Sequence, residues 1–157
     1  MKRDRRSLTC DEDYILDLCD ELLGCRAERQ RRFSFLRGDS GRCLPVDAFY
    51  PALGLVIEYR ERQHFETVSL FDRRPTVSGM SRGEQRARYD QLRRELLGEQ
   101  GIHLIELNVT EFPHNGRKRL RRVRLEDLNV LRQRLADFMH EDTFENLIEP
   151  DNKPCRR

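Results

Sequence analysis

The chain has 157 residues, the usual size of a single domain and enough to bury a core without disulfides or metal staples. Hydrophobic and charged residues each make up 37% of it, so there is enough apolar material to fold beneath a polar surface. No apolar run approaches the roughly 20 residues that a membrane helix needs, which excludes a membrane-spanning helix and predicts no membrane partner.

The cysteines and the start of the chain indicate an intracellular protein. Five cysteines form no CxxC pair, and their odd number is typical of reduced thiols rather than a disulfide framework or a zinc site. The first residues are not followed by an apolar stretch, so we expect no signal peptide and a cytoplasmic location.

The first elements in chain order are a helix and two strands. Thr9 to Glu12 have capping-box spacing, and the apolar residues that follow at helical spacing predict a helix ended by Gly24. Residues 32–36 alternate as a strand, and a glycine-containing turn follows at 38–41. A second strand is expected over about 42–49.

The middle of the chain predicts a buried strand and a second helix. After a turn at 51–54, residues 55–59 form the most apolar strand, typical of a central strand covered on both faces. Residues 66–81 are irregular and are interpreted as a loop. Ser81 to Glu84 have a second capping-box spacing, and the helix that follows is expected to stop at Gly101.

The last elements complete an α/β pattern. Residues 102–107 form a short apolar strand, and a final helix is expected over about 125–140. The order α-β-β-β-α-β-α predicts a mixed central sheet flanked by helices. We expect one domain over residues 1–140 and a polar tail over 141–157.

Two carboxylates stand near the ends of neighbouring predicted strands. If those strands form an antiparallel hairpin, Asp47 and Glu58 converge at one edge of the sheet, and alternation puts Arg60 on the same face as Glu58, with Tyr59 pointing away. Two such carboxylates suit Mg²⁺, which can activate a water and neutralise charge on a phosphate. From spacing alone, a turn carboxylate and a surface partner of an arginine are the alternatives.

A wider set of motifs carries a family resemblance. Residues 46–51 read Val-Asp-Ala-Phe-Tyr-Pro, and residues 55–65 read Leu-Val-Ile-Glu-Tyr-Arg-Glu-Arg-Gln-His-Phe; the helix supplies Asp90-Gln91-Leu92-Arg93 and the next strand opens Gly101-Ile102. In this order they resemble the signature of small PD-(D/E)xK proteins, the homing-endonuclease-like relatives of very-short-patch-repair endonucleases. The resemblance spans about residues 9–110 and implies a restriction-endonuclease-like core.

The resemblance implies a Mg²⁺- or Mn²⁺-dependent site. Asp47 would be the main metal ligand, and Glu58 would be a second ligand or would orient a metal-bound water. His64 would act as general base or acid, since an unperturbed imidazole titrates near pH 6.5. A histidine that only forms a hydrogen bond near the strand end is the alternative.

The resemblance also recruits residues from the flanking helices. Glu12 and Asp90 would complete an acidic cluster, and Arg93 would contact phosphate. Glu12 as a simple capping-box carboxylate, and Asp90 as an exposed partner of Arg94 one helical turn away, are the structural alternatives.

One departure from the family pattern concerns Arg60 and Glu61, which replace an expected Asp-Gly. Arg60 also occupies the lysine slot of the broader motif, where it would stabilise charge on a phosphorane but could not act as a base. Alternatively, Arg60 pairs with Glu58 and occupies the space of the cation.

The positive charge is almost entirely arginine, with three lysines among 30 basic residues, which suits phosphate contacts, although a coding bias toward arginine is an alternative. Two arginine-rich runs, 26–32 and 117–124, flank the motif-bearing core and predict contacts with DNA, unless they form only a solvated charged face. The predicted contact residues are Arg31, Arg32, Arg117 and Arg119.

Three hypotheses remain open. The first is a metal-dependent DNA endonuclease or nickase, which would need a homodimer or sequential nicks to cut both strands. The second is a catalytically idle copy of the fold that binds nucleic acid or a partner protein. The third is an unrelated α/β interaction domain.

Overall fold

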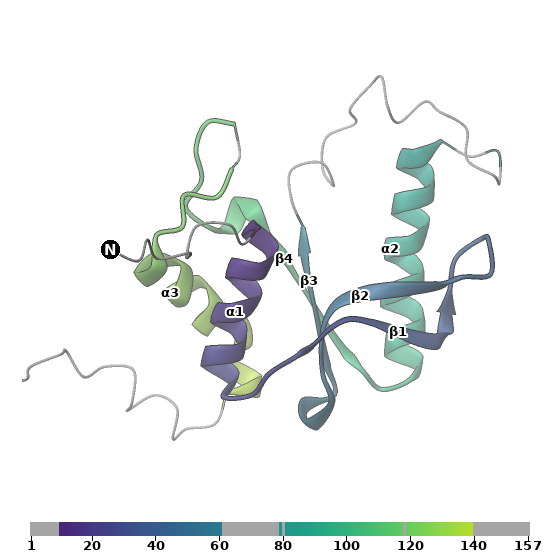
Figure 1. Ribbon diagram of the computed structural model, residues 1–157, viewed down its shortest axis with the longest axis horizontal. Helices are drawn as coiled ribbons and strands as arrows, with labels where there is room; N and C mark the ends of the chain where they lie inside the picture. Colours follow the sequence, from purple (N-terminus) through teal and green to yellow (C-terminus); the bar gives the residue numbers. More distant parts are fainter. Residues whose placement is uncertain (1–9, 61–78, 80, 118, 140–157) are drawn as a thin grey trace, which may run out of the picture.

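The computed structural model describes residues 10–60, 79, 81–117 and 119–139. Its helices and strands are α1 (Asp11–Leu23), β1 (Glu28–Arg37), β2 (Cys43–Tyr50), β3 (Leu55–Arg60), α2 (Arg82–Glu99), β4 (His103–Asn108) and α3 (Arg124–Leu135). This order is the predicted one, and the α/β class is confirmed (Figure 1). The predicted tail at 141–157 and nearly all of the predicted loop at 66–81 lie outside the described residues.

The four strands form one mixed sheet in the order β1-β2-β3-β4. The β1–β2 and β2–β3 pairs are antiparallel, and β3 and β4 are parallel, with Glu58 opposite Glu106. Every residue of β3 is buried, as its apolar run predicts for a central strand. The sheet therefore carries Glu58 and Arg60 on its most protected strand.

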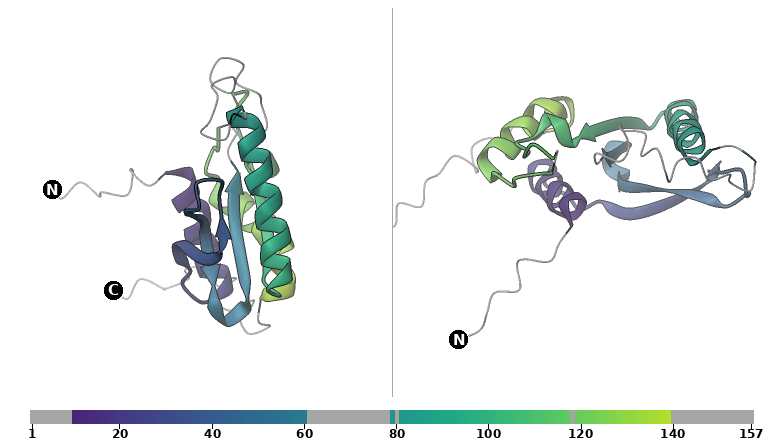
Figure 2. Two further views of the ribbon diagram at one scale, coloured as in Figure 1. Left: turned by 90° about the vertical axis from the view of Figure 1, so that its right-hand side faces the viewer. Right: turned by 90° about the horizontal axis from the view of Figure 1, so that it is seen from above.

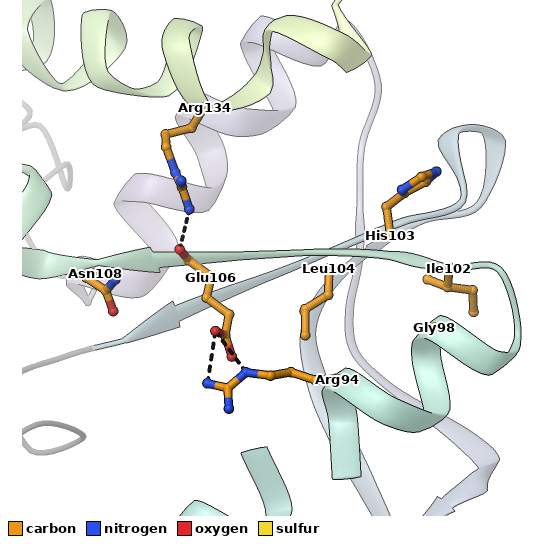
Figure 3. A pocket seen from close by; sticks show the side chains of 8 residues that line it. All are labelled: Arg94, Gly98, Ile102, His103, Leu104, Glu106, Asn108 and Arg134. Atoms are coloured by element: carbon orange, nitrogen blue, oxygen red, sulfur yellow. Dashed lines mark hydrogen bonds and ion pairs between the residues drawn. The ribbon is translucent and has the colours of Figure 1, made fainter. Parts of the chain in front are cut away.

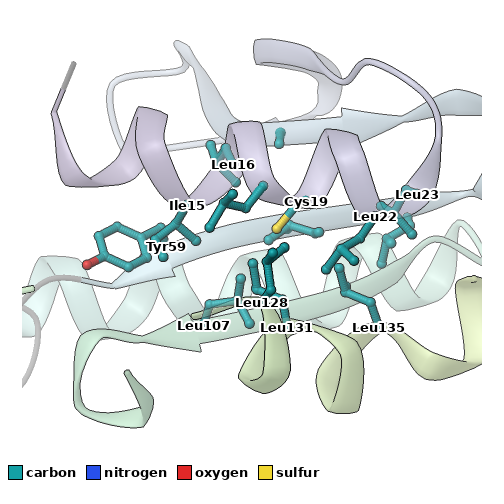
Figure 4. Close-up of a cluster of buried hydrophobic side chains, with 14 of the residues drawn as sticks. Ile15, Leu16, Cys19, Leu22, Leu23, Tyr59, Leu107, Leu128, Leu131 and Leu135 are labelled. Atoms are coloured by element: carbon teal, nitrogen blue, oxygen red, sulfur yellow. The ribbon is translucent and has the colours of Figure 1, made fainter. Parts of the chain in front are cut away.

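Helices cover both faces of the sheet. α1 and α3 lie on one face and α2 on the other (Figures 1 and 2). The larger core lies between α1, α3 and the sheet, where Ile15, Leu107 and Leu131 are fully buried (Figure 4). A smaller core under α2 contains Val56 and Leu97. Each fully buried aliphatic side chain stabilises the fold by about 1.5–3 kcal/mol.

Two helix ends agree with the local signals and two predicted boundaries were wrong. Gly24 ends α1 in the left-handed region, at φ 66°, and the Ser81–Glu84 capping box is formed. The N-cap of α1 is Cys10 rather than Thr9, because the Cys10 Sγ accepts the backbone N–H of Asp13 at 3.4 Å. α3 stops at Leu135 rather than at His140, since the chain tightens there into a 3₁₀ turn.

The first strand was also predicted too short. β1 begins at Glu28 rather than at residue 32, because its backbone pairs with β2 from Glu28 opposite Phe49 onward. The charged side chains of this segment carry no clear alternation, so only the pairing partner reveals that the segment is a strand.

Candidate functional site

Two carboxylates meet where the ladder between β2 and β3 ends. The ladder pairs Ala48 with Ile57 and stops before Asp47. Beyond that point the backbone N–H of Asp47 donates to Glu58 Oε1 at 3.1 Å, and the N–H of Tyr59 donates to Asp47 Oδ2 at 3.0 Å. Side-chain oxygens thus replace carbonyl oxygens as acceptors, and Asp47 and Glu58 lie together as the antiparallel hairpin predicts.

Glu58 lies in an environment that disfavours its negative charge. Its exposed fraction is 7%, and burial, reinforced by the charge of Asp47, raises the pKa of Glu58 to about 8. Arg93, whose Nε is 3.6 Å from Glu58 Oε1, acts in the opposite direction but does not cancel the effect. A cation bound beside these oxygens would favour the ionised carboxylate.

The guanidinium of Arg60 binds carboxylates on α2 and β4 rather than Glu58. Its ion pairs within the described residues are to Asp90 Oδ2, at 2.5 Å from Nη1, and to Glu106 Oε1 through Nη2. Burial alone would lower the pKa of Arg60, but the contacts with Asp90 and Glu106 raise it overall. The alternative in which Arg60 pairs with Glu58 is therefore not what the structure contains, while Tyr59 packs in the opposite core as alternation predicts.

α2 delivers Asp90 and Arg93 to the same face of the sheet. These residues are three apart, so they project from one side of the helix, and Arg93 Nη1 lies 3.4 Å from Asp90 Oδ1. Arg93 Nη2 also donates to the carbonyl of Pro45 at 3.1 Å. The alternative of Asp90 as a partner of Arg94 is wrong, because the guanidinium of Arg94 binds Glu106 instead.

Gln30 on β1 links Glu12 to the carboxylate pair. Its Nε2 donates to Glu12 Oε1 at 3.3 Å and to Asp47 Oδ1 at 3.4 Å. Gln30 has φ 51°, a left-handed conformation that costs a non-glycine residue about 1–2 kcal/mol. No sequence signal distinguishes Gln30 from its polar neighbours, and it was not predicted. Glu12 is not the capping-box partner of a Thr9 cap, since the helix is capped by Cys10.

Glu106 is a second site residue that the sequence interpretation missed. Oε1 of its carboxylate binds Arg60 and Oε2 binds Arg94. Its backbone carbonyl accepts a hydrogen bond from Arg134 Nη2 at 2.8 Å, and the contacts with Arg94 and Arg134 are seen in Figure 3. Together with Arg94 and Arg134 it lines an open groove of about 560 Å³ along β4. A signal was present, because Glu106 is the only acidic residue in segment 102–107, whose other residues apart from His103 are apolar. His64, the predicted general base, lies outside the described residues.

The donor set suits a hard divalent cation. Asp47 and Glu58 supply carboxylate oxygens, the ligands that Mg²⁺ and Mn²⁺ prefer, and the raised pKa of Glu58 marks a place where added positive charge is favourable. Within the described ranges no group of three or more potential ligands was found. Mg²⁺ commonly uses one or two carboxylates and completes its shell with waters and phosphate oxygens, so the pair fits such an ion.

The arginines predicted to contact DNA fall into two regions. Arg31 pairs with Glu28 at 3.1 Å and stacks over the ring of Phe33, and Arg32 is exposed beside it on β1. Arg117 and Arg119 are exposed on a loop on the α1–α3 side (Figure 1).

Several neighbours of these arginines are held in ion pairs within the chain. Arg122 binds Asp11 at 2.7 Å, and Arg124 binds Glu21 at 2.6 Å. Part of the arginine charge in the second run is therefore structural rather than available to a ligand.

A comparison with known proteins found a viral relative. Uncharacterized protein 094L of Frog virus 3 (isolate Goorha) is 32% identical over 94 residues, which make up 60% of this chain and 58% of that protein. The chain thus spans less than two thirds of the length of this relative. No protein-family model and no solved structure matches. No helix in the described part of the chain is both long and apolar enough to cross a bilayer.

Proposed function

We propose that the chain is a metal-dependent endonuclease or nickase that hydrolyses phosphodiester bonds in DNA, built on a restriction-endonuclease-like core. The observation that carries the proposal is the Asp47–Glu58 pair at the end of the β2–β3 ladder, held by backbone N–H groups and partly buried. The order α-β-β-β-α-β-α and the position of Arg60 two residues after Glu58 support the assignment.

The chemistry follows from the charges around the pair. A bound Mg²⁺ or Mn²⁺ supplies a water of lowered pKa and neutralises charge on the phosphate. Asp47 and Glu58 would hold the ion, and the N–H groups of Asp47 and Tyr59 fix the orientation of both carboxylates. Because these donors are part of the sheet, the ligands need little reorganisation on binding.

The arginines of the site, Arg93 and Arg60, would bind or stabilise the negative charge of the phosphate. Arg93 lies between Glu58 and the carbonyl of Pro45 and is the best placed donor for a phosphate oxygen beside the pair. Arg60 stays protonated and cannot accept a proton, so it contributes positive charge only. The family resemblance gives the role of general base or acid to His64, which lies outside the described residues.

A catalytically idle domain that binds nucleic acid or a partner protein is the second candidate. It is favoured by the hydrogen bonds that Asp47 already accepts through both oxygens, from Gln30 and from Tyr59. In that case hydrogen bonds and arginines within the chain, rather than a cation, balance the charges of Asp47 and Glu58.

The test is a nicking assay on supercoiled plasmid with Mg²⁺ or Mn²⁺ and an EDTA control. Asp47→Asn keeps the shape of the side chain and removes its charge, so we expect metal-dependent nicking by the wild type to disappear in this variant. Asp137→Asn, an exposed carboxylate beyond α3, is the matched control and should nick normally.

DNA binding is tested separately by its salt dependence. Phosphate contacts release counterions, so the affinity should fall steeply as salt rises, and Arg32→Gln should reduce that slope. Binding that is insensitive to salt would remove the phosphate contacts from the proposal.

A further inference from the structure

We propose that Glu106 is a positioning residue that holds the guanidinium of Arg60 toward β4 and thereby leaves Glu58 open to a cation. The inference rests on the proposed metal site at Asp47 and Glu58. It concerns a residue on a different strand, outside the motif that led to that site.

The geometry divides the Glu106 carboxylate between two arginines. Oε1 binds Arg60 Nη2. Oε2 accepts hydrogen bonds from Arg94 Nε at 3.2 Å and from Arg94 Nη2 at 3.1 Å (Figure 3). Arg134 Nη2 anchors the backbone carbonyl of Glu106 from α3. Arg94 thus holds the side chain of Glu106 through Oε2, and Oε1 is left to bind Arg60.

Arg60 needs such a clamp because Glu58 competes for it. The two residues are two apart on β3, on the same face, and the parallel register places Glu106 directly opposite Glu58. The side chain of Arg60 is 8% exposed, so its charge must be balanced by neighbouring carboxylates rather than by water. Asp90 on α2 holds Nη1 of Arg60, and Glu106 holds Nη2. If Glu106 no longer carried charge, Nη2 would lose its partner, and Glu58 would be an available replacement on the same face.

The consequence for a cation is electrostatic. Arg93 Nε already lies 3.6 Å from Glu58 Oε1, and an Arg60–Glu58 ion pair would add a second fixed positive charge beside this proposed ligand and would compete directly with the metal. Residues that orient metal ligands without touching the metal typically alter metal affinity 10–100-fold when replaced. Glu106 acts through Arg60, by keeping this competitor of the metal away from Glu58.

The experiment measures Mn²⁺ binding to the EDTA-treated full-length protein by isothermal titration calorimetry. Glu106→Gln should raise the Kd for Mn²⁺ about tenfold or more relative to the wild type. The double variant Arg60→Gln with Glu106→Gln should restore near wild-type affinity, because the competitor is gone. Glu95→Gln, an exposed α2 carboxylate, should leave the Kd unchanged.

Each outcome separates the clamp from a purely structural network. Unchanged Mn²⁺ affinity in Glu106→Gln overturns the inference, as does weak binding that the double variant fails to restore. If Glu106→Gln does not fold, Arg94→Gln, whose side chain is 47% exposed, replaces it and should also weaken Mn²⁺ binding. A wild type that binds no Mn²⁺ overturns the proposed function itself, and this inference with it.

Discussion

Replacing Glu58 with glutamine should make the metal-free protein less sensitive to pH. Burial and the charge of Asp47 raise the pKa of Glu58 from 4.5 to about 8, so between these values the folded protein keeps a proton that the unfolded chain has lost. The folded state is then favoured at the low end of the window, and stability falls as pH rises until Glu58 ionises near pH 8 in the folded protein. Glutamine does not titrate and lacks this dependence.

The size of the effect follows from linkage. With these two pKa values, the contribution of Glu58 to the free energy of unfolding falls by about 2 kcal/mol between about pH 6 and about pH 8. The difference in stability between Glu58→Gln and the wild type should therefore grow by about that amount in favour of the variant over the same interval. Comparing the two proteins cancels the groups that titrate there and do not interact with Glu58.

The assay is urea denaturation of both proteins at the two pH values, in EDTA and again with Mg²⁺. A cation that binds the ionised pair should stabilise the wild type most at the higher pH and reduce its pH dependence, with little effect on the variant. Parallel stability–pH curves for the two metal-free proteins would refute the reasoning, because Glu58 would then titrate alike in the folded and unfolded chains.

Two further substitutions test the surroundings of the site and the helix layer. Gln30→Gly should stabilise the protein by about 1 kcal/mol in urea denaturation, because glycine adopts φ 51° without strain. The same variant should slow nicking, because it removes the hydrogen bond from Gln30 to Asp47. A loss of stability would contradict the strain assigned to Gln30. Tyr14→Phe should destabilise the fold by about 1–3 kcal/mol, because it removes the 2.8 Å hydrogen bond to the fully buried Asp127, whereas an unchanged thermal midpoint would show that this bond contributes nothing.

Much of the fold could be predicted because its signals are local. The apolar run of residues 55–59 indicated a central strand, Gly24 a helix end and Ser81 to Glu84 a helix start, and each of these lies where it was expected. The start of β1 was missed because its charged side chains show no alternation, and only its pairing with β2 makes it a strand.

From strand pattern alone, the site was predictable only where two strands are adjacent in sequence, whereas Glu12, Asp90 and Arg93 were expected there only from the family resemblance. Alternation along β3 and the hairpin with β2 were enough to bring Asp47 to Glu58 and to separate Tyr59 from them. The carboxylate that pairs with Arg60 was not predictable from the sequence. Glu106 lies more than forty residues further along the chain, on a strand that a crossover connection brings into parallel register with β3. Gln30 was hidden because its backbone conformation has no counterpart in the sequence pattern.

The most direct test of the central claim is plasmid nicking by the wild type and by Asp47→Asn, with Asp137→Asn as the control. The Asp47–Glu58 site predicts that the wild type and the control convert supercoiled plasmid to the nicked form with Mg²⁺ or Mn²⁺ and not with EDTA, while Asp47→Asn folds but does not nick. DNA binding by a folded wild type that nicks with neither metal would contradict the claim and favour the idle domain.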